Sequence, residues 1–365
     1  MKHILTLILV FIGQLSCANM ASPLQEGSWT ATPFISKYVE IVKETILIKP
    51  DKKFDTAWFE IEYHIDVKKA GVQIPFLFYA SEFRENFTLL MDGKEIQLSP
   101  QPRSYKKLEG TELRDFSSLF ETEIWNGTSD LRVGEPESQA FYISMRDLKF
   151  FKVNLTKGNH IIRVVYRADK WFDQSDWIKE YSFRYALFPA KYWNSFGSLE
   201  VTLDASQFDG KLTTNLGEPN SGNLQSKCVW TFTSVPTDVF QLTYKPPMNP
   251  KAKRLLAISP IGLTLIMSLL LILLHIFAII AARRLSPQRR YSWTVIIGSI
   301  IVPFLALFSY QYAFDIIDAA IGEHASQYHG YTFFTLLLYP IALPIYWSMM
   351  WFLDKGIEKR KVKSQ

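Results

Sequence analysis

Cysteine is nearly absent from this sequence, which has only Cys17 and Cys228 among its 365 residues. Cys17 falls in a segment that we expect to be removed or lipidated, so the mature chain cannot form an internal disulfide. A disulfide-stapled extracellular scaffold is therefore excluded. Cys228 lies in the strand-like run SKCVWTFTS, where we expect a buried, inert thiol rather than a nucleophile or an intermolecular bridge.

Motifs that would name a chemistry are missing as well. The sequence has no Gly-x-Ser-x-Gly elbow, no phosphate-binding loop and no dinucleotide fingerprint. We therefore predict no cofactor and assign no enzymatic activity. The net charge of +5 does not indicate nucleic acid as a partner, because many of the basic residues stand in short clusters beside apolar stretches, where they orient a chain in a bilayer.

Charged residues are absent from residues 255–282. About 20 apolar residues at about 1.5 Å each already cross a bilayer core of about 30 Å, so this stretch predicts a transmembrane helix. Residues 293–314 and 331–353 predict a second and a third. The lipid bilayer is thus the first predicted partner.

The charges between these spans predict their orientation. Residues 283–292 form an arginine-rich loop and residues 354–365 a basic tail, whereas residues 315–330 are acidic and hold no lysine or arginine. The positive-inside rule then places the loop and the tail in the cytoplasm. Three basic residues before the first span depart from the rule, namely Lys251, Lys253 and Arg254. A large exported domain translocates regardless of such charges.

The N-terminus has the form of a secretory signal. A short basic start precedes an apolar run over residues 4–15, which is too short to span a membrane, and small residues follow. We predict a signal peptide over residues 1–18, cleaved after Ala18. The alternative is a lipoprotein acylated at Cys17, although Leu15 is one place too close to that cysteine. Either way, the chain that follows is exported.

Residues 22–250 read as a strand-rich exported domain. In residues 56–67, TAWFEIEYHIDV, apolar and polar side chains alternate, which predicts a half-buried antiparallel strand. Asp92-Gly93 predicts a tight hairpin turn. Residues from about 99 to 138 are an irregular insertion with one short helix near 113–120. Regular short strands elsewhere predict an all-β ectodomain, an antiparallel β-sandwich, followed by an α-helical membrane domain of three transmembrane helices.

Several of these strands carry a resemblance. The runs VKETILI, WFEIEYHI, MDGKEI, LTKGNHIIRVVYRA and YSFRYALFPAKYWNSFGSLEVTLDA resemble the layout of uncharacterised bacterial exported, membrane-anchored β-sandwich proteins. The similarity covers about 150 residues, and its most distinctive part is residues 185–203. The family has no established catalytic residues, so the resemblance implies a fold and a compartment but no site.

Aromatic and acidic side chains gather in one part of the ectodomain. Aromatic rings beside carboxylates suit stacking on a sugar, and paired carboxylates are what glycoside hydrolysis requires. The alternative is that the rings fill the core and the aspartates make turns. The candidate ligand-binding residues are Trp171, Asp173, Asp176, Trp177, Tyr192 and Trp193.

The loop after the second span holds the richest polar cluster. Carboxylates three residues apart share a helix face, and two histidines could complete a site for a divalent metal. The spacing matches no defined zinc motif such as His-Glu-x-x-His, and an acidic outer loop that obeys the charge rule is the alternative. The candidate metal ligands are Asp315, Asp318, Glu323, His324 and His329.

His275 is the only ionisable residue inside the first span. Polar groups at that depth usually face protein and mark function or packing. A proton relay needs a chain of such groups, which the other spans do not supply at this depth, so structural hydrogen bonding is the alternative. Three Asn-x-Thr triplets, at Asn86, Asn126 and Asn154, are glycan acceptors only if the source is eukaryotic.

Together these patterns predict a bacterial inner-membrane protein with its ectodomain in the periplasm or outside and its C-terminus in the cytoplasm. The expected function is binding or assembly with other membrane or envelope proteins. One alternative is an enzyme that acts on envelope glycans or lipids through Asp173, Asp176 or the loop at 315–330. Another is an accessory subunit of a transporter or ion-coupled complex that uses His275.

Overall fold

The computed structural model describes residues 39–80, 82–99, 120–122, 130–133, 141–144, 147–187, 195–237, 239–285 and 292–362. The described chain forms two compact units. Residues up to Asp173 and from Glu180 to Pro246 form a β unit, and Gln174–Lys179 joins the residues from Pro247 onward in a helical unit. The predicted signal peptide, with Cys17, and the predicted helix at 113–120, apart from its last residue, lie outside the described residues.

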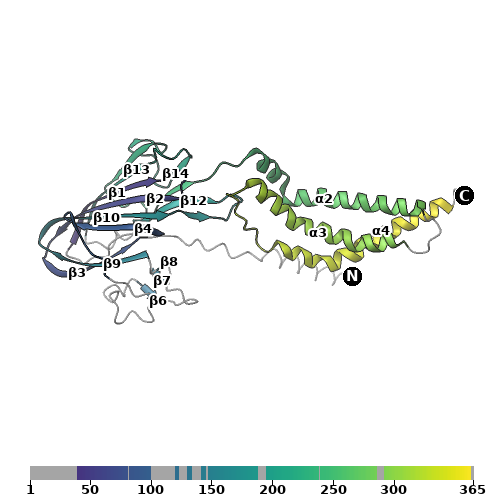
Figure 1. Cartoon of the computed structure of the whole chain (residues 1–365), viewed down its shortest axis with the longest axis horizontal. Coiled ribbons are helices and arrows are strands. Elements are labelled where there is room, and N and C mark those ends of the chain that lie inside the picture. The colour runs from purple at the N-terminus through teal and green to yellow at the C-terminus, as the bar shows by residue number, and fades with distance from the viewer. Residues whose placement is uncertain are drawn as a thin grey trace. The chain divides into compact units, whose positions relative to one another are not determined.

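The β unit is built on an eight-stranded sheet in the order β15-β16-β13-β1-β2-β10-β4-β5, whose long central strands lie side by side in Figure 1. Smaller sheets have the orders β11-β12-β17-β14, β3-β9 and β6-β7-β8. The strands are β1 Val39–Pro50, β2 Thr56–Val67, β3 Gly71–Tyr79, β4 Phe83–Met91, β5 Lys94–Glu95, β6 Phe120–Thr122, β7 Asp130–Val133, β8 Phe141–Ser144, β9 Leu148–Leu155, β10 Gly158–Asp169, β11 Trp171–Asp173, β12 Glu180–Ala186, β13 Phe196–Asp204, β14 Leu212–Thr214, β15 Ser221–Gly222, β16 Lys227–Phe232 and β17 Val239–Tyr244.

Two local predictions are confirmed. Strand β2 alternates as the sequence indicates, with Phe59, Ile61 and Tyr63 fully buried and the glutamates between them on the other face. The turn at Asp92-Gly93 joins β4 to β5, and both residues have positive φ, 49° and 76°. A short polar residue followed by glycine tolerates that conformation, which is why the dipeptide predicts the turn.

One pair of strands differs from the prediction of a purely antiparallel fold. Strand β1 pairs with β13 in parallel and with β2 antiparallel, so the large sheet is mixed. Parallel neighbours need a long crossover connection, and here the chain between β1 and β13 runs through all the strands from β2 to β12. The sequence indicates strands at β1 and β13 but carries no local signal for which partner a strand will choose, and it does not indicate β6 and β7, which fall in the predicted irregular insertion.

A bulge in β1 determines which of its side chains are buried. Ile41 pairs with Ile65 of β2 and Lys43 pairs with the next partner, His64, so Val42 has no partner in β2 and is the extra residue of the bulge. Before the bulge Val39 and Ile41 point into the core, and after it Glu44 and every second residue do. The bulge therefore buries Ile46 and Ile48, and it buries the carboxyl of Glu44 with them.

Gly197 makes this bulge possible. It lies opposite Val42 in the parallel pair, between the partners Ile41↔Phe196 and Lys43↔Ser198. A Cβ atom at Gly197 would lie 2.1 Å from the carbonyl oxygen of Val42. Only glycine allows the two backbones to approach so closely.

The described residues of the helical unit form three long helices, α2 Pro250–Leu285, α3 Trp293–Ile321 and α4 Tyr339–Val362 (Figure 1). The 3-10 helix η4 Thr332–Leu338 precedes α4. All three are long and apolar enough to cross a membrane, α4 together with η4. Many of their large apolar side chains are exposed, among them Leu274 at 65%, Phe277 at 69% and Phe352 at 68%.

The first predicted span contains a break. Ser259 has φ 67° and ψ 160°, which is not helical, and Pro260 follows it. Proline disfavours helical backbone in the residue before it and suits the first position of a helix. The Ser259 hydroxyl accepts a hydrogen bond from the Gly262 N–H at 3.2 Å, which caps the helix that restarts at Pro260.

The second helix is longer than predicted. Helix α3 continues through Asp315 and Asp318, which the sequence assigns to the outer loop, and ends at Ile321. Residues 315–321 contain no glycine or proline, and Gly322, with φ 90°, is the first residue that ends the helix. The charge pattern that suggests a loop boundary at 315 is thus weaker than the local preference for helix.

Replacing Gly197 with alanine should lower the free energy of unfolding of the β unit by about 1–3 kcal/mol, because the new Cβ would overlap the Val42 carbonyl. Chemical denaturation of the full-length protein, followed by tryptophan fluorescence, measures this change. Ser198→Ala, one position along β13, is the control and should change the free energy by less than about 0.5 kcal/mol. Equal stability of Gly197→Ala and the wild type would contradict the close approach of the two strands.

Candidate functional site

A row of charged and aromatic side chains crosses the outer face of the large sheet. Lys49 of β1 pairs with Trp58 of β2, and Trp58 pairs with Arg167 of β10. Arg167 pairs with Glu85 of β4 at one end of the row. At the other end Lys49 lies beside Asp204 of β13, with Lys49 Nζ 3.7 Å from Asp204 Oδ2. Trp58 thus has a cation on each neighbouring strand, and each cation faces a carboxylate.

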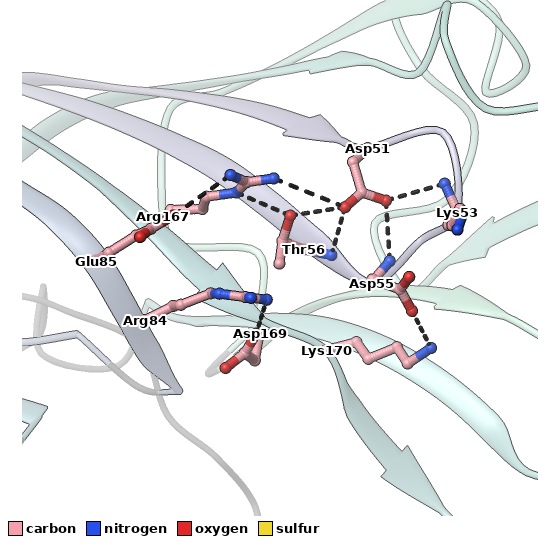
Figure 2. A network of polar contacts seen from close by, with 9 residues as sticks. All are labelled: Asp51, Lys53, Asp55, Thr56, Arg84, Glu85, Arg167, Asp169 and Lys170. Carbon is pink, nitrogen blue, oxygen red and sulfur yellow. Dashed lines mark hydrogen bonds and ion pairs between the residues drawn. The ribbon is translucent and has the colours of Figure 1, made fainter.

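The turn between β1 and β2 closes one end of this row. Both oxygens of the Asp51 carboxylate are engaged by the turn itself, as Figure 2 shows. Oδ1 accepts the backbone N–H groups of Lys53 and Asp55 at 3.0 and 2.9 Å, and Oδ2 accepts the N–H and the hydroxyl of Thr56 at 2.9 and 2.7 Å. Partial burial would raise the Asp51 pKa, but these hydrogen bonds outweigh it and lower the pKa below its usual value.

The turn is held to the core by an unusual residue. Phe54 adopts φ 59° and is completely buried, and its ring contacts those of Phe183 and Phe208 with centroids 4.6 and 5.1 Å apart. A bulky residue rarely adopts positive φ, so burial of the ring compensates for an unfavourable backbone. The position of Asp51 therefore depends on core packing.

Arg167 connects the turn to the sheet (Figure 2). Its Nε donates to the Thr56 hydroxyl at 2.9 Å, Nη1 donates to Glu85 Oε1 at 3.4 Å, and Nη2 lies 3.9 Å from Asp51 Oδ2. Lys170 pairs with Asp55 at 2.6 Å on the same side of the turn. The guanidinium is thus oriented by three groups, and only the Thr56 contact is a short hydrogen bond.

These side chains surround a cavity of about 260 Å³. Its lining comes from the row, from the turn and from the residues that follow β13. Asp204 accepts hydrogen bonds from the Ser206 hydroxyl and N–H at 2.7 and 3.4 Å, which lower the Asp204 pKa. The lining residues are Lys49, Pro50, Asp51, Thr56, Trp58, Arg167, Asp204, Ser206 and Gln207. The cavity offers donors, acceptors and a ring, which is binding chemistry rather than a nucleophile.

A second polar group is buried in the core of the same unit. The Tyr185 hydroxyl donates to Glu44 Oε1 at 2.8 Å, and the Tyr63 and Tyr185 hydroxyls are hydrogen-bonded to each other, with their oxygens 2.7 Å apart. Glu44 is fully buried and its Oε2 has no hydrogen-bond partner among the described residues. Burial raises the pKa of Glu44 and outweighs the hydrogen bonds from Tyr185 and Tyr63, so the pKa is about 7.

The aromatic and acidic residues predicted as a ligand site are divided between the two units. Trp171 and Asp173 belong to β11, where the Arg184 guanidinium covers the Trp171 ring at 3.5 Å. Desolvation lowers the Arg184 pKa to about 10, although nearby acidic groups, Asp173 first, act to raise it. Asp176 and Trp177 belong to the helical unit. Tyr192 and Trp193 lie outside the described residues.

Trp177 meets the residues predicted as metal ligands. Its ring lies 5.4 Å from that of Phe314 and 4.6 Å from that of His329, measured between centroids. His329 Nε2 contacts Asp318 Oδ2 at 2.6 Å. The segment 174–179 is fixed by its backbone too, because Lys179 donates to the His324 carbonyl and Ser326 donates to the Trp177 carbonyl.

The other predicted metal ligands are not gathered around this pair. Asp315 is exposed, Glu323 is 86% exposed, and His324 Nε2 lies 3.4 Å from Glu323 Oε1. Among the described residues no group of three or more histidine, cysteine, aspartate or glutamate side chains could hold a metal ion. Asp318 and His329 instead join Trp177 and Phe314 in one packed cluster.

His275 has hydrogen-bond partners on both ring nitrogens. Nδ1 contacts the Tyr346 hydroxyl at 2.9 Å, and Nε2 contacts the Thr294 carbonyl at 3.1 Å. A carbonyl can only accept, so Nε2 carries the proton, and Nδ1 accepts from Tyr346. Gly298 leaves room for the ring, since a Cβ there would lie 2.1 Å from Nε2. This geometry is that of a structural link between α2, α3 and α4.

Cys228 is buried, as the sequence predicts, with 1% of its surface exposed. Desolvation raises the pKa of its thiol to about 11, so the thiol is protonated and unreactive at neutral pH.

The polar cavity is the feature that the sequence did not reveal. Lys49, Trp58 and Arg167 each stand at outward-facing positions of predicted strands, and that alternation is the only signal. Their association requires the strand register, which no local pattern encodes. The only sequence signal for the buried Glu44 is its position two residues before Ile46, on the same face of a predicted strand.

Replacing Glu44 with glutamine should remove a pH dependence of stability. A carboxyl whose pKa is higher in the folded protein than in the unfolded chain stabilises the fold fully below about pH 4.5, and this contribution is lost as pH rises to about 7. The loss in the wild type is about 3 kcal/mol. Denaturation at a series of pH values measures the slope, with Glu40→Gln as the control. An unchanged slope in Glu44→Gln would contradict the assignment.

Replacing Trp177 with alanine should release the segment 174–179, because the ring contacts with Phe314 and His329 are lost. We expect trypsin cleavage after Lys179 to become about tenfold faster. Trp171→Ala is the control, since that ring lies in β11 and contacts Arg184 instead. Equal cleavage rates in the two variants would show that Trp177 does not hold the segment.

No family model matches the chain, and no curated protein matches it by sequence. Solved structures do match. An M1 zinc metallopeptidase from Deinococcus radiodurans is 7% identical, with 59% of this chain and 44% of that chain covered and a TM-score of 0.26. Native leukotriene A4 hydrolase from Saccharomyces cerevisiae is 7% identical, with coverage of 65% and 34% and a TM-score of 0.31.

The yeast hydrolase in complex with bestatin is 6% identical, with 65% of this chain and 33% of that chain covered and a TM-score of 0.32. This chain thus spans less than half the length of these three proteins. TM-scores and identities this low carry no argument about fold or activity. The sequence also lacks the His-Glu-x-x-His motif with which metalloproteases bind zinc.

Proposed function

We propose that the protein is an integral membrane protein of the bacterial cell envelope that works in binding or assembly. Three helices anchor a β-sandwich domain, which a signal peptide directs to the periplasm or the outside. The sandwich engages an envelope partner, and the helices contact lipid and other membrane proteins. The observation that carries this proposal is the exposure of large apolar side chains along all three helices.

Exposure of these apolar side chains to water would be unfavourable. Leu273, Leu274 and Phe277 of α2 are each more than half exposed, and Ile341, Met349 and Phe352 of α4 are too. Burying one such side chain is worth about 1.5–3 kcal/mol, so leaving dozens of them in water is inconsistent with a stable soluble domain. A bilayer accepts the same surface without a penalty.

The polar groups within the helices support the same environment. Arg283 and Asp354 are each 4% exposed at the side chain and form a bidentate pair, Nε to Oδ1 at 2.7 Å and Nη2 to Oδ2 at 2.5 Å. His275 is satisfied on both nitrogens. Ionisable groups near lipid are expected to pair in this way. The orientation rests on the sequence, in which the arginine loop and the basic tail follow the positive-inside rule.

Core packing supports the sandwich. Apolar residues of the eight-stranded sheet and of the β11-β12-β17-β14 sheet belong to one buried cluster. Phe59 of β2 contacts Phe183 and Tyr185 of β12, with ring centroids 6.5 and 6.4 Å apart. Two sheets that share one apolar core in this way are typical of a sandwich.

The contacts of Asp173, Asp176 and His275 favour binding over catalysis and over ion coupling. Asp173 lies in β11, and Asp176 Oδ1 accepts the backbone N–H of Trp177 at 2.7 Å, a local contact typical of a loop aspartate. His275 Nε2 donates to the backbone carbonyl of Thr294, which cannot pass a proton on. The cavity beside Trp58, by contrast, offers several polar groups to a ligand.

Membrane anchoring and orientation are tested together. The full-length protein, expressed with its signal, should stay in the pellet after alkaline carbonate extraction of membranes. A cytoplasm-dependent reporter fused after Gln365 should be active, and the same reporter fused at Thr237, inside the predicted exported domain, should not be. Extraction into the soluble fraction, or activity at Thr237, would refute the anchored topology.

Binding is tested by crosslinking in intact cells followed by identification of copurified proteins. We expect a reproducible set of envelope proteins, unchanged in a His275→Leu variant that is expressed at the wild-type level. Loss of all partners in His275→Leu, with the protein still abundant, would favour the ion-coupled subunit instead.

A further inference from the structure

The cavity beside Trp58 is lined by residues of β1, β2, β10 and β13 and of the segments that follow β1 and β13. It has a volume of about 260 Å³ and combines one aromatic ring with two basic and two acidic side chains. The ring and the two basic groups stand on three adjacent strands, in the order Lys49, Trp58, Arg167. Strand pairing fixes the spacing between neighbouring Cβ atoms of these residues at about 4.5–5.5 Å.

Several groups in the cavity keep hydrogen-bonding capacity. Lys49 Nζ is 3.7 Å from Asp204 Oδ2, and Arg167 Nη2 is 3.9 Å from Asp51 Oδ2, and both distances are too long for a direct hydrogen bond. Among the residues that the structure describes, Trp58 has no ring contact and no hydrogen bond to its indole N–H. Half-buried and unstacked, the ring is available to a ligand.

The charges indicate what kind of ligand fits. Lys49 and Arg167 contribute two positive charges and Asp51 and Asp204 two negative ones, so the lining is neutral in sum. A phosphate or another strong anion would meet the carboxylates as well as the cations. A neutral ligand whose groups both donate and accept hydrogen bonds can bond to the basic and the acidic side chains at once, and sugar hydroxyls have this property.

The size and the ring point to the same class. Pockets for drug-sized ligands start at about 300 Å³, so this cavity suits a single ring with its substituents. The apolar face of a pyranose stacks on tryptophan, while the hydroxyls at its edge reach charged and amide groups. Gln207 and Ser206, which line the cavity, supply such groups, and Asp51 does not, because the turn engages both of its oxygens.

We propose that this cavity binds one neutral pyranose unit of an envelope glycan, with the ring stacked on Trp58 and the hydroxyls held by Lys49, Arg167 and Asp204. The inference deepens the proposed function, on which it rests for the presence of glycan on the exported side. It assigns no bond cleavage. The predicted sugar site around Trp171 and Asp173 is a different place, since neither residue lines this cavity.

Saturation-transfer NMR on the full-length protein tests this proposal. The protein is held in phosphatidylcholine nanodiscs, so that no sugar-headed detergent competes. The probes are methyl glucoside and N-acetylglucosamine as neutral sugars, galacturonic acid as an anionic sugar and glycylglycine as a zwitterion. We expect transfer to at least one neutral sugar, with a Kd of about 1 mM because the ligand is a single ring.

Two variants remove proposed contacts to the sugar, and one matched control variant keeps them. Trp58→Thr keeps a strand-forming residue and should weaken sugar binding by about tenfold or more, and Lys49→Met should weaken it about three- to tenfold. Lys43→Met is the control. Lys43 lies on the same face of β1 and pairs with an acid of β13, Glu200, at 2.9 Å, but it does not line the cavity. Circular dichroism checks that each variant is folded.

Each outcome decides the proposal. Transfer to a neutral sugar that is lost in Trp58→Thr and kept in Lys43→Met supports it. Transfer to none of the neutral sugars, transfer only to glycylglycine or galacturonic acid, or equal transfer in Trp58→Thr and Lys43→Met would overturn it. The topology and crosslinking experiments are separate from these measurements, so a failed sugar site with intact anchoring refutes this inference alone.

Discussion

The single extra residue in β1 is the constraint on which the β unit depends. Without the bulge at Val42, strict alternation would carry Lys49 to the buried face and leave Ile46 and Ile48 in water. With the bulge, Ile46 and Ile48 join Ile41 in the core, and Lys49 joins the outer row beside Trp58. Gly197 permits it, because no other residue could approach the Val42 carbonyl so closely. The core and the candidate ligand site therefore arise from one local irregularity.

The bulge also has an energetic consequence. It buries Glu44, whose carboxyl loses water and receives one short hydrogen bond from Tyr185. An apolar residue at this position would avoid the penalty, so the glutamate weakens the fold at neutral pH while the rest of the core compensates. Bulges are common beside functional sites, and here the strand that carries the bulge ends at the cavity.

In the helical unit, the ionisable side chains His275, Arg283 and Asp354 find hydrogen-bond partners on other helices. His275 bonds to α3 and α4, and Arg283 forms its bidentate pair with Asp354. These contacts are directional, whereas the apolar surface around them is not. We infer that the polar pairs define how α2, α3 and α4 pack, because lipid gives apolar side chains no reason to prefer protein.

The sequence alone determined the features that depend on neighbours along the chain: the three apolar helices, the alternation in β2, the Asp92-Gly93 turn and the burial of Cys228. These follow from hydrophobicity, periodicity and backbone preference, which act over a few residues. Only the tertiary structure decided the parallel pairing of β1 with β13, the packing of Trp177 against His329, and the row that joins Lys49, Trp58 and Arg167. Each of these brings together segments far apart in sequence, and pairing of that kind is selected by the packing of the whole core rather than by any local signal.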